Sequence, residues 1–298
     1  MRAALVAMML VLLAGPAAAG AFEDGLSAYN RQDYATALRM WRPLADQGNA
    51  SAQSNLGFMY DIGQGVPKDD VQAVKWYRLA ADQGNVIAQF NLGLMYVSGQ
   101  GVPKDYAQAV KWFRLAADQG YANAQSNLGF MYDIGQGVPK DDGLAMKWYR
   151  LAADQGNVSA QFNLGIMYDN GRGVPKDYVQ AVKWYRLAAD QGNVIAQFNL
   201  GLMYVSGQGV PKDYVQAVKW YRLAADQGYA KAQTNLGAMY ANGQGVPRDY
   251  VLAYMWSNLG AAGGNELGGK NRDTTIAPHM TPAAIEEAQR LSREWKPK

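Results

Sequence analysis

Residues 85–120 read NVIAQFNLGLMYVSGQGVPKDYAQAVKWFRLAADQG, and this 36-residue stretch recurs along most of the chain. Residues 85–106 are repeated without change at 193–214. Tryptophan keeps the same period, at positions 76, 112, 148, 184, 220 and 256, and so does a Gly-x-Gly pair. A fixed period of this length is typical of repeat proteins, in which similar units stack one on the next.

Each unit has two segments with apolar residues at helical spacing. In residues 85–120 these are Ala88, Leu92, Met95 and Tyr96, then Tyr106, Ala109, Phe113, Ala116 and Ala117. Between them, Gly99 suits the left-handed conformation that ends a helix, and Pro103 prevents the helix from continuing. Asp105 can cap the next helix by accepting from its free amides. We therefore predict a first helix, a loop and a second helix in each unit, and name the helices A and B.

The units are expected to stack, because one helix pair of this size cannot bury its apolar face alone. Small residues mark the predicted close approaches between helices, Gly93 on helix A and Ala109 on helix B. The sequence therefore predicts an all-α fold, a solenoid of about six to seven helix pairs over residues 22–264.

Both ends of the chain depart from the repeat. Residues 1–21 combine Arg2, an apolar run and three alanines at 17–19, which is typical of a signal peptide cleaved after Ala19 or Ala21. Residues 22–42 are expected to contribute only a helix B preceded by a short amphipathic segment. The C-terminal segment 265–298 is predicted to consist of a Gly/Asn-rich loop at 265–277 and a helix that starts at Thr281-Pro282. This helix is expected to cap the end of the solenoid.

Composition narrows the function. The net charge of +3 is too small to indicate a nucleic-acid-binding protein. With no cysteine and one histidine, His279, the common nucleophile systems and most zinc sites lack their side chains. Adjacent acidic pairs such as Asp69-Asp70 occupy helix-start positions. We therefore predict a chain that is not an enzyme, with no catalytic, metal or cofactor-binding residues and no membrane span after cleavage, located in the periplasm or secreted.

The recurring pattern AxxNLGxMYxxGxGVPxDYxxAxxWYxxAAxQG resembles the Sel-one-like repeat family, relatives of the tetratricopeptide repeats, over about residues 22–264. The resemblance implies a right-handed superhelical α-solenoid that acts as an adaptor for other proteins. It also implies a concave groove lined by helix A, in which an asparagine can hold the backbone or terminal carboxylate of a ligand. The absence of cysteine departs from the cysteine-rich bacterial branch of the family.

Differences between the nearly identical units point to the same surface. On helix A they gather at Ile87, Phe90, Leu94 and Val97 and at the equivalent positions of other units, which share one helical face. We predict that this face binds a protein or peptide partner. The predicted binding residues are Phe90, Asn91, Leu94, Ser126, Asn127, Phe130, Phe162, Asn163, Ile166, Phe198, Asn199 and Leu202.

Three alternatives remain open from the sequence. The apolar residues of this face can pack against the neighbouring unit, with the asparagines bonded to backbone. The chain can instead bind or cleave a cell-wall glycan, peptidoglycan, or serve as a spacer. Helix B carries a basic row, such as Lys111 and Arg114, with Asp118 four residues after the arginine. This row is either a solvated face with weak intrahelical pairs or a track for an acidic polymer, and we expect the aspartates to pair between units.

Overall fold

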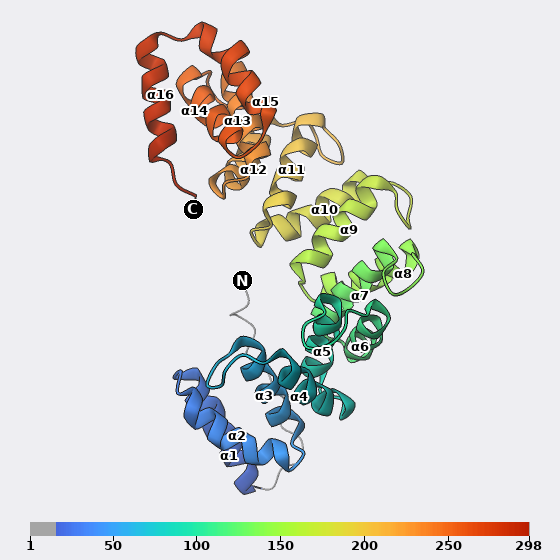
Figure 1. Ribbon diagram of the computed structural model, residues 1–298. Helices are drawn as coiled ribbons and strands as arrows, with labels where there is room; N and C mark the ends of the chain where they lie inside the picture. The colour runs from blue at the N-terminus through green and yellow to red at the C-terminus, as the bar shows by residue number, and fades with distance from the viewer. Residues whose placement is uncertain (1–15, 298) are drawn as a thin grey trace. The chain divides into compact units, whose positions relative to one another are not determined.

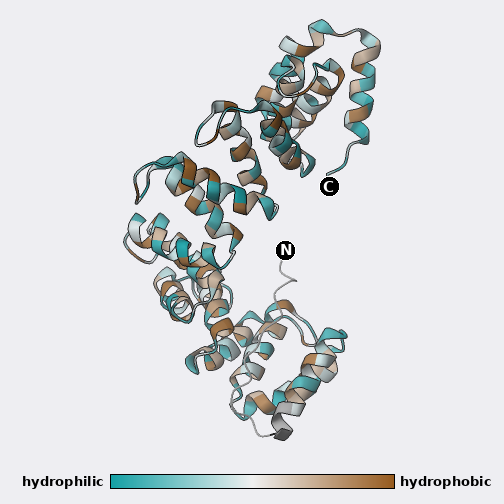
Figure 2. Cartoon of the chain, turned by 180° about the vertical axis from the view of Figure 1, so that it is seen from behind, coloured by the Kyte–Doolittle hydropathy of each residue, from teal (hydrophilic) through white to brown (hydrophobic). Residues whose placement is uncertain are grey.

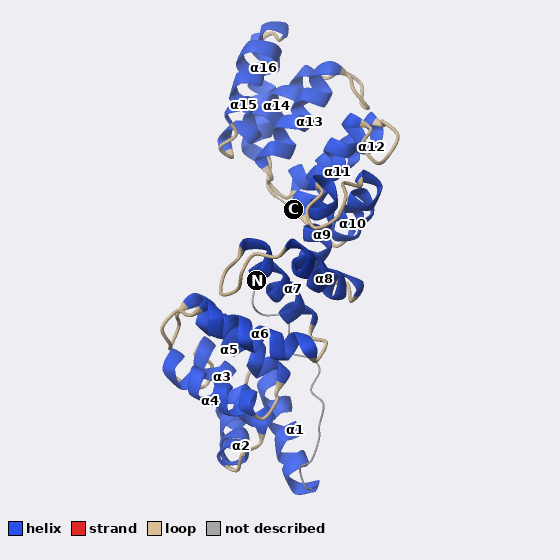
Figure 3. Ribbon diagram, turned by 90° about the vertical axis from the view of Figure 1, so that its right-hand side faces the viewer, coloured by secondary structure: helices blue, strands red, loops and turns tan. Residues whose placement is uncertain are grey.

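The computed structural model describes residues 16–297, and within this range the regular structure is entirely helical (Figures 1 and 3). The helices are α1 (Pro16–Asn30), α2 (Tyr34–Asp46), α3 (Ala50–Ile62), α4 (Asp70–Asp82), α5 (Val86–Ser98), α6 (Tyr106–Asp118), α7 (Ala122–Ile134), α8 (Asp142–Asp154), α9 (Val158–Asn170), α10 (Tyr178–Asp190), α11 (Val194–Ser206), α12 (Tyr214–Asp226), α13 (Ala230–Asn242), α14 (Tyr250–Ala262), α15 (Glu266–Lys270), the π-helix η1 (Asn271–Ile276), the short 3₁₀ helix η2 (Ala277–His279) and α16 (Pro282–Glu294).

The helices form two compact parts, one ending at Ala152 and the other beginning at Ala153. From here on these parts are called the first and the second unit, and each 36-residue stretch is called a repeat. Within each unit, helix A packs on helix B of its own repeat, as in α3/α4, α5/α6, α9/α10 and α11/α12. Helix B then packs on helix A of the next repeat, as in α4/α5 and α12/α13. This succession of packed helix pairs is the predicted α-solenoid.

The helix boundaries follow from the residues expected to set them. Gly99 ends α5 with a φ of 75°, in the left-handed region. The side chain of Asp105 accepts a hydrogen bond from the backbone N–H of Gln108 at 3.0 Å, which caps the start of α6. Asn85 caps α5 in the same way, through the backbone N–H of Ala88 at 2.9 Å.

The loop between α5 and α6 packs tightly against the preceding repeat. A β-carbon on Gly101 would lie 2.1 Å from the carbonyl oxygen of Asp70, at the start of α4. The same close approach recurs at Gly137, Gly209 and Gly245. The second glycine of each Gly-x-Gly pair therefore allows one repeat to contact the backbone of the repeat before it.

Small residues lie at the helix–helix contacts, as predicted. A β-carbon on Gly93 of α5 would lie 2.6 Å from the ring of Phe113 on α6. Ala88 of α5 and Ala109 of α6 are fully buried, and Ala88 belongs to a core cluster that includes Tyr77 of α4. Most helices carry both apolar and polar residues, which is the pattern of helices that pack on one side (Figure 2).

A ladder of buried glutamines links successive repeats. Gln89 is 4% exposed, and its Nε2 donates to the carbonyl oxygen of Ala81 on the preceding helix B at 3.1 Å. Its Oε1 accepts from Nε2 of Gln119 at 2.7 Å, and Gln119 also donates to the carbonyl oxygen of Gly84 at 3.1 Å. The bond to the preceding helix B recurs at Gln53, Gln125, Gln161, Gln197 and Gln233.

The N-terminal prediction was wrong in one respect, since the first repeat has both helices. Helix A of this repeat is α1, which packs on α2. A β-carbon on Gly25 would lie 2.4 Å from Nε1 of Trp41, and that nitrogen donates to the carbonyl oxygen of Phe22 at 3.1 Å. The predicted cleavage sites after Ala19 and Ala21 lie within α1, whereas residues 1–15 of the predicted signal peptide lie outside the described range.

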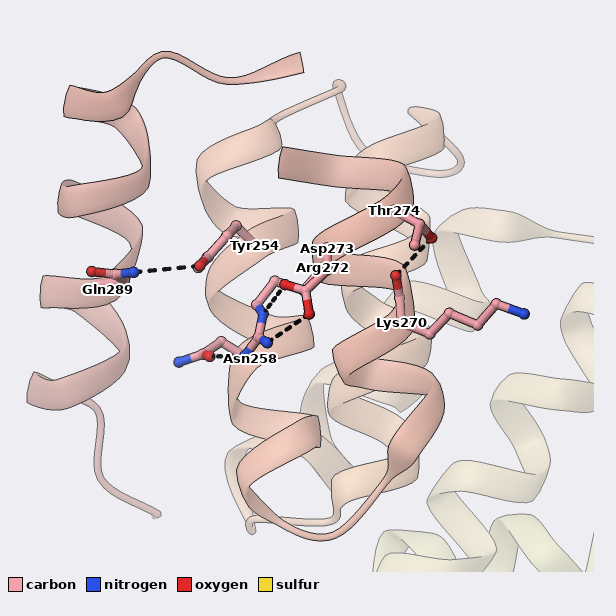
Figure 4. Close-up of polar contacts among 7 residues, drawn as sticks. All are labelled: Tyr254, Asn258, Lys270, Arg272, Asp273, Thr274 and Gln289. Atoms are coloured by element: carbon pink, nitrogen blue, oxygen red, sulfur yellow. Dashed lines mark hydrogen bonds and ion pairs between the residues drawn. The ribbon is translucent and has the colours of Figure 1, made fainter. Parts of the chain in front are cut away.

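At the C-terminal end, the predicted loop at 265–277 was also wrong, because these residues form α15, η1 and the start of η2. Asn265 caps α15, and Gly268 approaches α14 so closely that a β-carbon would lie 2.8 Å from the carbonyl oxygen of Ser257. Arg272 of η1 bonds Asn258 of α14 at 2.7 Å (Figure 4). These contacts explain why a glycine-rich segment is helical here.

The capping helix was predicted correctly. It is α16, whose first turn is capped by Thr281 through the backbone N–H of Ala284 at 3.2 Å. It packs on α14, where Gln289 lies 3.4 Å from the hydroxyl of Tyr254 (Figure 4).

Candidate functional site

Successive A helices in each unit place apolar side chains at one repeat position, two residues before the Tyr of the NLGxMY pattern. We name these residues the helix-A row: Phe58, Leu94 and Phe130 in the first unit, and Ile166, Leu202 and Ala238 in the second. Leu94, Phe130 and Leu202 are 38%, 47% and 41% exposed. Large apolar side chains are therefore accessible on α5, α7 and α11.

The predicted phenylalanines four residues earlier lie differently. Phe90 is half-buried, with its ring centroid 5.8 Å from that of Phe113 and 5.2 Å from that of Tyr121. Phe198 makes the equivalent contacts with Tyr221 and Tyr229. These phenylalanines join one repeat to the next, so part of each ring is unavailable to a partner.

The remaining predicted residues also divide by burial. Phe162 is half-buried against Tyr185, at 6.0 Å between centroids, and Ile166 is half-buried. Ser126 is 8% exposed. The structure therefore leaves Leu94, Phe130 and Leu202 as the most accessible of the predicted apolar residues.

The repeated asparagines of helix A face tyrosine hydroxyls of the preceding helix B. Asn199 hydrogen-bonds to Tyr185, and Asn235 hydrogen-bonds to Tyr221. In α6 this tyrosine is replaced by Phe113, which has no hydroxyl, and Nδ2 of Asn127 donates instead to the carbonyl oxygen of Asn123 at 2.9 Å. Asn91 lies beside Tyr77, and Asn163 is half-buried.

Burial raises the pKa of the Tyr221 hydroxyl to about 12, and the bond from Asn235 opposes part of this rise. Because the folded-state pKa lies above the unfolded value of about 10, Tyr221 contributes stability below pH 10 that is lost as the pH rises towards 12. The free energy of unfolding of the unaltered chain should fall between pH 9 and pH 11. In the Tyr221→Phe variant we expect this fall to be smaller by about 1 kcal/mol. Urea unfolding at both pH values measures this difference, and an equal loss in both proteins would contradict the assignment.

The basic row of helix B reaches between repeats. Arg78 of α4 donates to the hydroxyl of Tyr96 on α5, and its guanidinium lies 5.9 Å from the centre of that ring. The equivalent bond is made by Arg114, Arg186 and Arg222. An Arg–Asp pair within one helix forms in α2, between Arg42 and Asp46 at 3.2 Å. For Arg78, Arg114, Arg186 and Arg222 the bonded residue is a tyrosine of the next repeat, which spacing within a helix does not predict.

Within residues 16–297, no group of three or more His, Cys, Asp and Glu side chains is placed to hold a metal ion. The single histidine, His279, stacks on Tyr250 at 5.0 Å between ring centres. No helix in the same range combines the length and apolar character needed to span a bilayer.

A family model for the Sel1 repeat matches residues 18–49, 50–85, 86–121, 122–157, 158–193, 194–229 and 230–265. The chain belongs to the Sel1 repeat family. The seven matches confirm the resemblance inferred from the repeat pattern, and the first of them, which begins within α1, covers most of the helix that was missed. No curated protein matches the chain.

Two examples illustrate the solved structures to which this chain is similar. One is a protective antigen of uropathogenic Escherichia coli strains that displays a Sel1-like repeat fold, with 41% identity and a TM-score of 0.78. The alignment covers 86% of this chain but only 56% of the E. coli protein. The other is a Sel1 repeat protein from Oxalobacter formigenes, with 36% identity and a TM-score of 0.72, covering 80% of this chain and 96% of that one. Sel1 repeats generally serve as protein–protein interaction modules.

Proposed function

We propose that this Sel1 repeat chain is a non-catalytic scaffold that binds a partner protein or peptide on the helix-A row. The observation that carries the proposal is the exposure of Leu94 and Phe130, at 38% and 47%, on α5 and α7 of one unit. Exposed apolar side chains of this size that also vary between repeats are candidates for an interaction surface, whereas the equally exposed leucines of helix B, such as Leu79 and Leu115, do not vary among the inner repeats. An amphipathic helix or an extended segment with apolar side chains would fit such a row.

The variation between repeats supports the same surface. Gly93 and Ala88 are buried and recur in the A helices of the inner repeats, whereas the helix-A row contains Phe, Leu, Ile and Ala. Packing explains the constant positions, because a larger side chain there would meet helix B. Leu94, Phe130 and Leu202 of the row are exposed, so at these positions the side chain can be matched to a partner.

The proposed location is the bacterial periplasm or the extracellular medium. It rests on the signal-peptide pattern of residues 1–21. The partner would then be a protein of the cell envelope or the medium.

The test is affinity capture from an envelope extract, followed by mass spectrometry. We expect Leu94→Glu with Phe130→Glu to abolish capture of a protein that the unaltered chain retains, because a charge cannot be buried against an apolar partner without a large cost. Leu79→Glu with Leu115→Glu is the matched control. These leucines of helix B are exposed to a similar degree, at 41% and 40%.

Capture that survives in the row variant, or that is lost equally in the control, would contradict the proposal. Circular dichroism of each variant establishes that its helices are intact. If the unaltered chain retains purified peptidoglycan and no protein, the glycan-binding alternative would replace the scaffold.

A further inference from the structure

A cleft of ≈ 510 Å³ opens in the first unit between α4, α5, α6 and the loop that joins α5 to α6. Its wall includes three cationic side chains, Arg78, Lys104 and Lys111, together with the aromatic rings of Tyr96 and Trp112. It does not include the helix-A row. Tyr96 and Leu94 are two positions apart on α5, which places them about 200° apart around the helix.

Aromatic rings hold the cations of this cleft in place. The ammonium of Lys111 lies 5.0 Å from the ring centre of Trp112, and that of Lys104 lies 4.8 Å from the ring centre of Tyr106. Arg78 is bonded to the hydroxyl of Tyr96. These contacts restrict three long side chains before any ligand arrives, which lowers the entropic cost of binding an anion.

The charge balance of the cleft suits a carboxylate. Two acidic side chains, Asp82 and Asp105, also line it, so the three cations leave a net charge of +1. Asp105 is already engaged as the cap of α6, at 3.0 Å from the backbone nitrogen of Gln108. A net charge of +1 matches a singly charged group better than a dianion. Trp112 and Pro103, which also line the cleft, can contact the methylene groups that precede a side-chain carboxylate.

The same residue types recur in other repeats, and the second unit shows the same three contacts. Arg186 donates to the hydroxyl of Tyr204, as Arg78 does to Tyr96. Lys212 lies 4.7 Å from the ring centre of Tyr214, and Lys219 lies 5.6 Å from that of Trp220. Asp82, Asp105 and Gln108 correspond to Asp190, Asp213 and Gln216.

We propose that this cleft, and the equivalent residues of the second unit, bind the aspartate or glutamate side chains of an acidic peptide segment. The surface is independent of the helix-A row, so the chain would have a second docking site with a different chemistry. The two sites would let one partner place an apolar segment on the A helices and an acidic segment beside the B helices.

Calorimetric titration of the full chain with an octaglutamate peptide tests this inference at low salt. We expect binding that weakens as salt is added, because the contact is between charges. Lys111→Gln with Lys219→Gln should weaken binding at least tenfold. Lys231→Gln with Lys270→Gln is the matched control, since it removes the same charge from two exposed lysines outside the cleft residues.

Three results would overturn the inference. An octaglutamine peptide that binds as tightly would show that charge is not recognised. An equal loss of affinity in the control variant would show that overall charge, rather than the cleft, attracts the peptide. Binding of a soluble polyuronate without binding of the peptide would assign the cleft to an acidic glycan instead.

Discussion

Replacing Gly101 with alanine is expected to lower the free energy of unfolding by about 2–4 kcal/mol, from left-handed strain of about 1 kcal/mol and overpacking of about 1–3 kcal/mol. Gly101 has a φ of 69°, and its β-carbon would lie 2.1 Å from the carbonyl oxygen of Asp70. The obstructing atom belongs to the backbone of α4, so no rotamer change relieves the contact. Urea unfolding followed by circular dichroism measures the loss.

Gly84→Ala is the control for Gly101→Ala. Gly84 also has a positive φ, 86°, but a β-carbon there meets no atom within 4 Å. Its expected cost is the backbone strain alone, about 1 kcal/mol. If the two substitutions cost the same, the loop of one repeat does not hold the repeat before it as the structure describes.

Replacing Gln89 with leucine is expected to destabilise the chain by about 1–3 kcal/mol, although leucine is apolar and the position is buried. The substitution preserves most of the volume but removes the side-chain donor to the carbonyl oxygen of Ala81, which keeps its bond from the backbone N–H of Gly84 at 2.9 Å. It also removes the acceptor of Gln119. Urea unfolding of the full chain gives the change.

Gln119→Leu tests the exposed partner of Gln89 and so compares the exposed bonds of the glutamine ladder with the buried ones. Gln119 is exposed, so water can replace its bonds, and we expect a cost below about 1 kcal/mol. A larger loss for Gln119→Leu than for Gln89→Leu would contradict the view that the ladder stabilises the array through its buried bonds.

The repeat could be predicted from sequence because its signals are local and recur. Gly99 and Asp105 determine where one helix ends and the next begins, and both act as expected. The missed helices, α1 and α15, lack the NLGxMY pattern. Two signals were present, however: Gly25 at a helix–helix contact, and Asn265 after a glycine, as Asn85 follows Gly84.

Contacts between repeats could not be predicted from helical periodicity. Arg78 reaches Tyr96, 18 residues away, and Gln119 reaches Gln89, 30 residues away. These pairs depend on how far one repeat is displaced from the next, which spacing within a helix does not specify. Spacing within the helix places Asp82 near Arg78, but the bond that the structure shows is to Tyr96 of the next repeat.

The candidate site shows the same limit. Periodicity places Phe90 and Leu94 on one face of α5, and both positions vary between repeats. The structure buries part of Phe90 against Tyr121, which belongs to the following repeat, while Leu94 remains accessible. A position free to vary is therefore not always free of packing, and the neighbouring repeat decides which residues can meet a partner.

The identity of α5 and α11 has a consequence for folding. The two helices have the same sequence but belong to different units. Tyr221 of α12, which faces α11, corresponds to Phe113 of α6, which faces α5. The packing site of α5 therefore differs only slightly from that of α11. Register-shifted chains and swaps between molecules are characteristic failures of such arrays. We therefore expect the order of the helices along the chain to matter more for correct assembly than selective affinity between them.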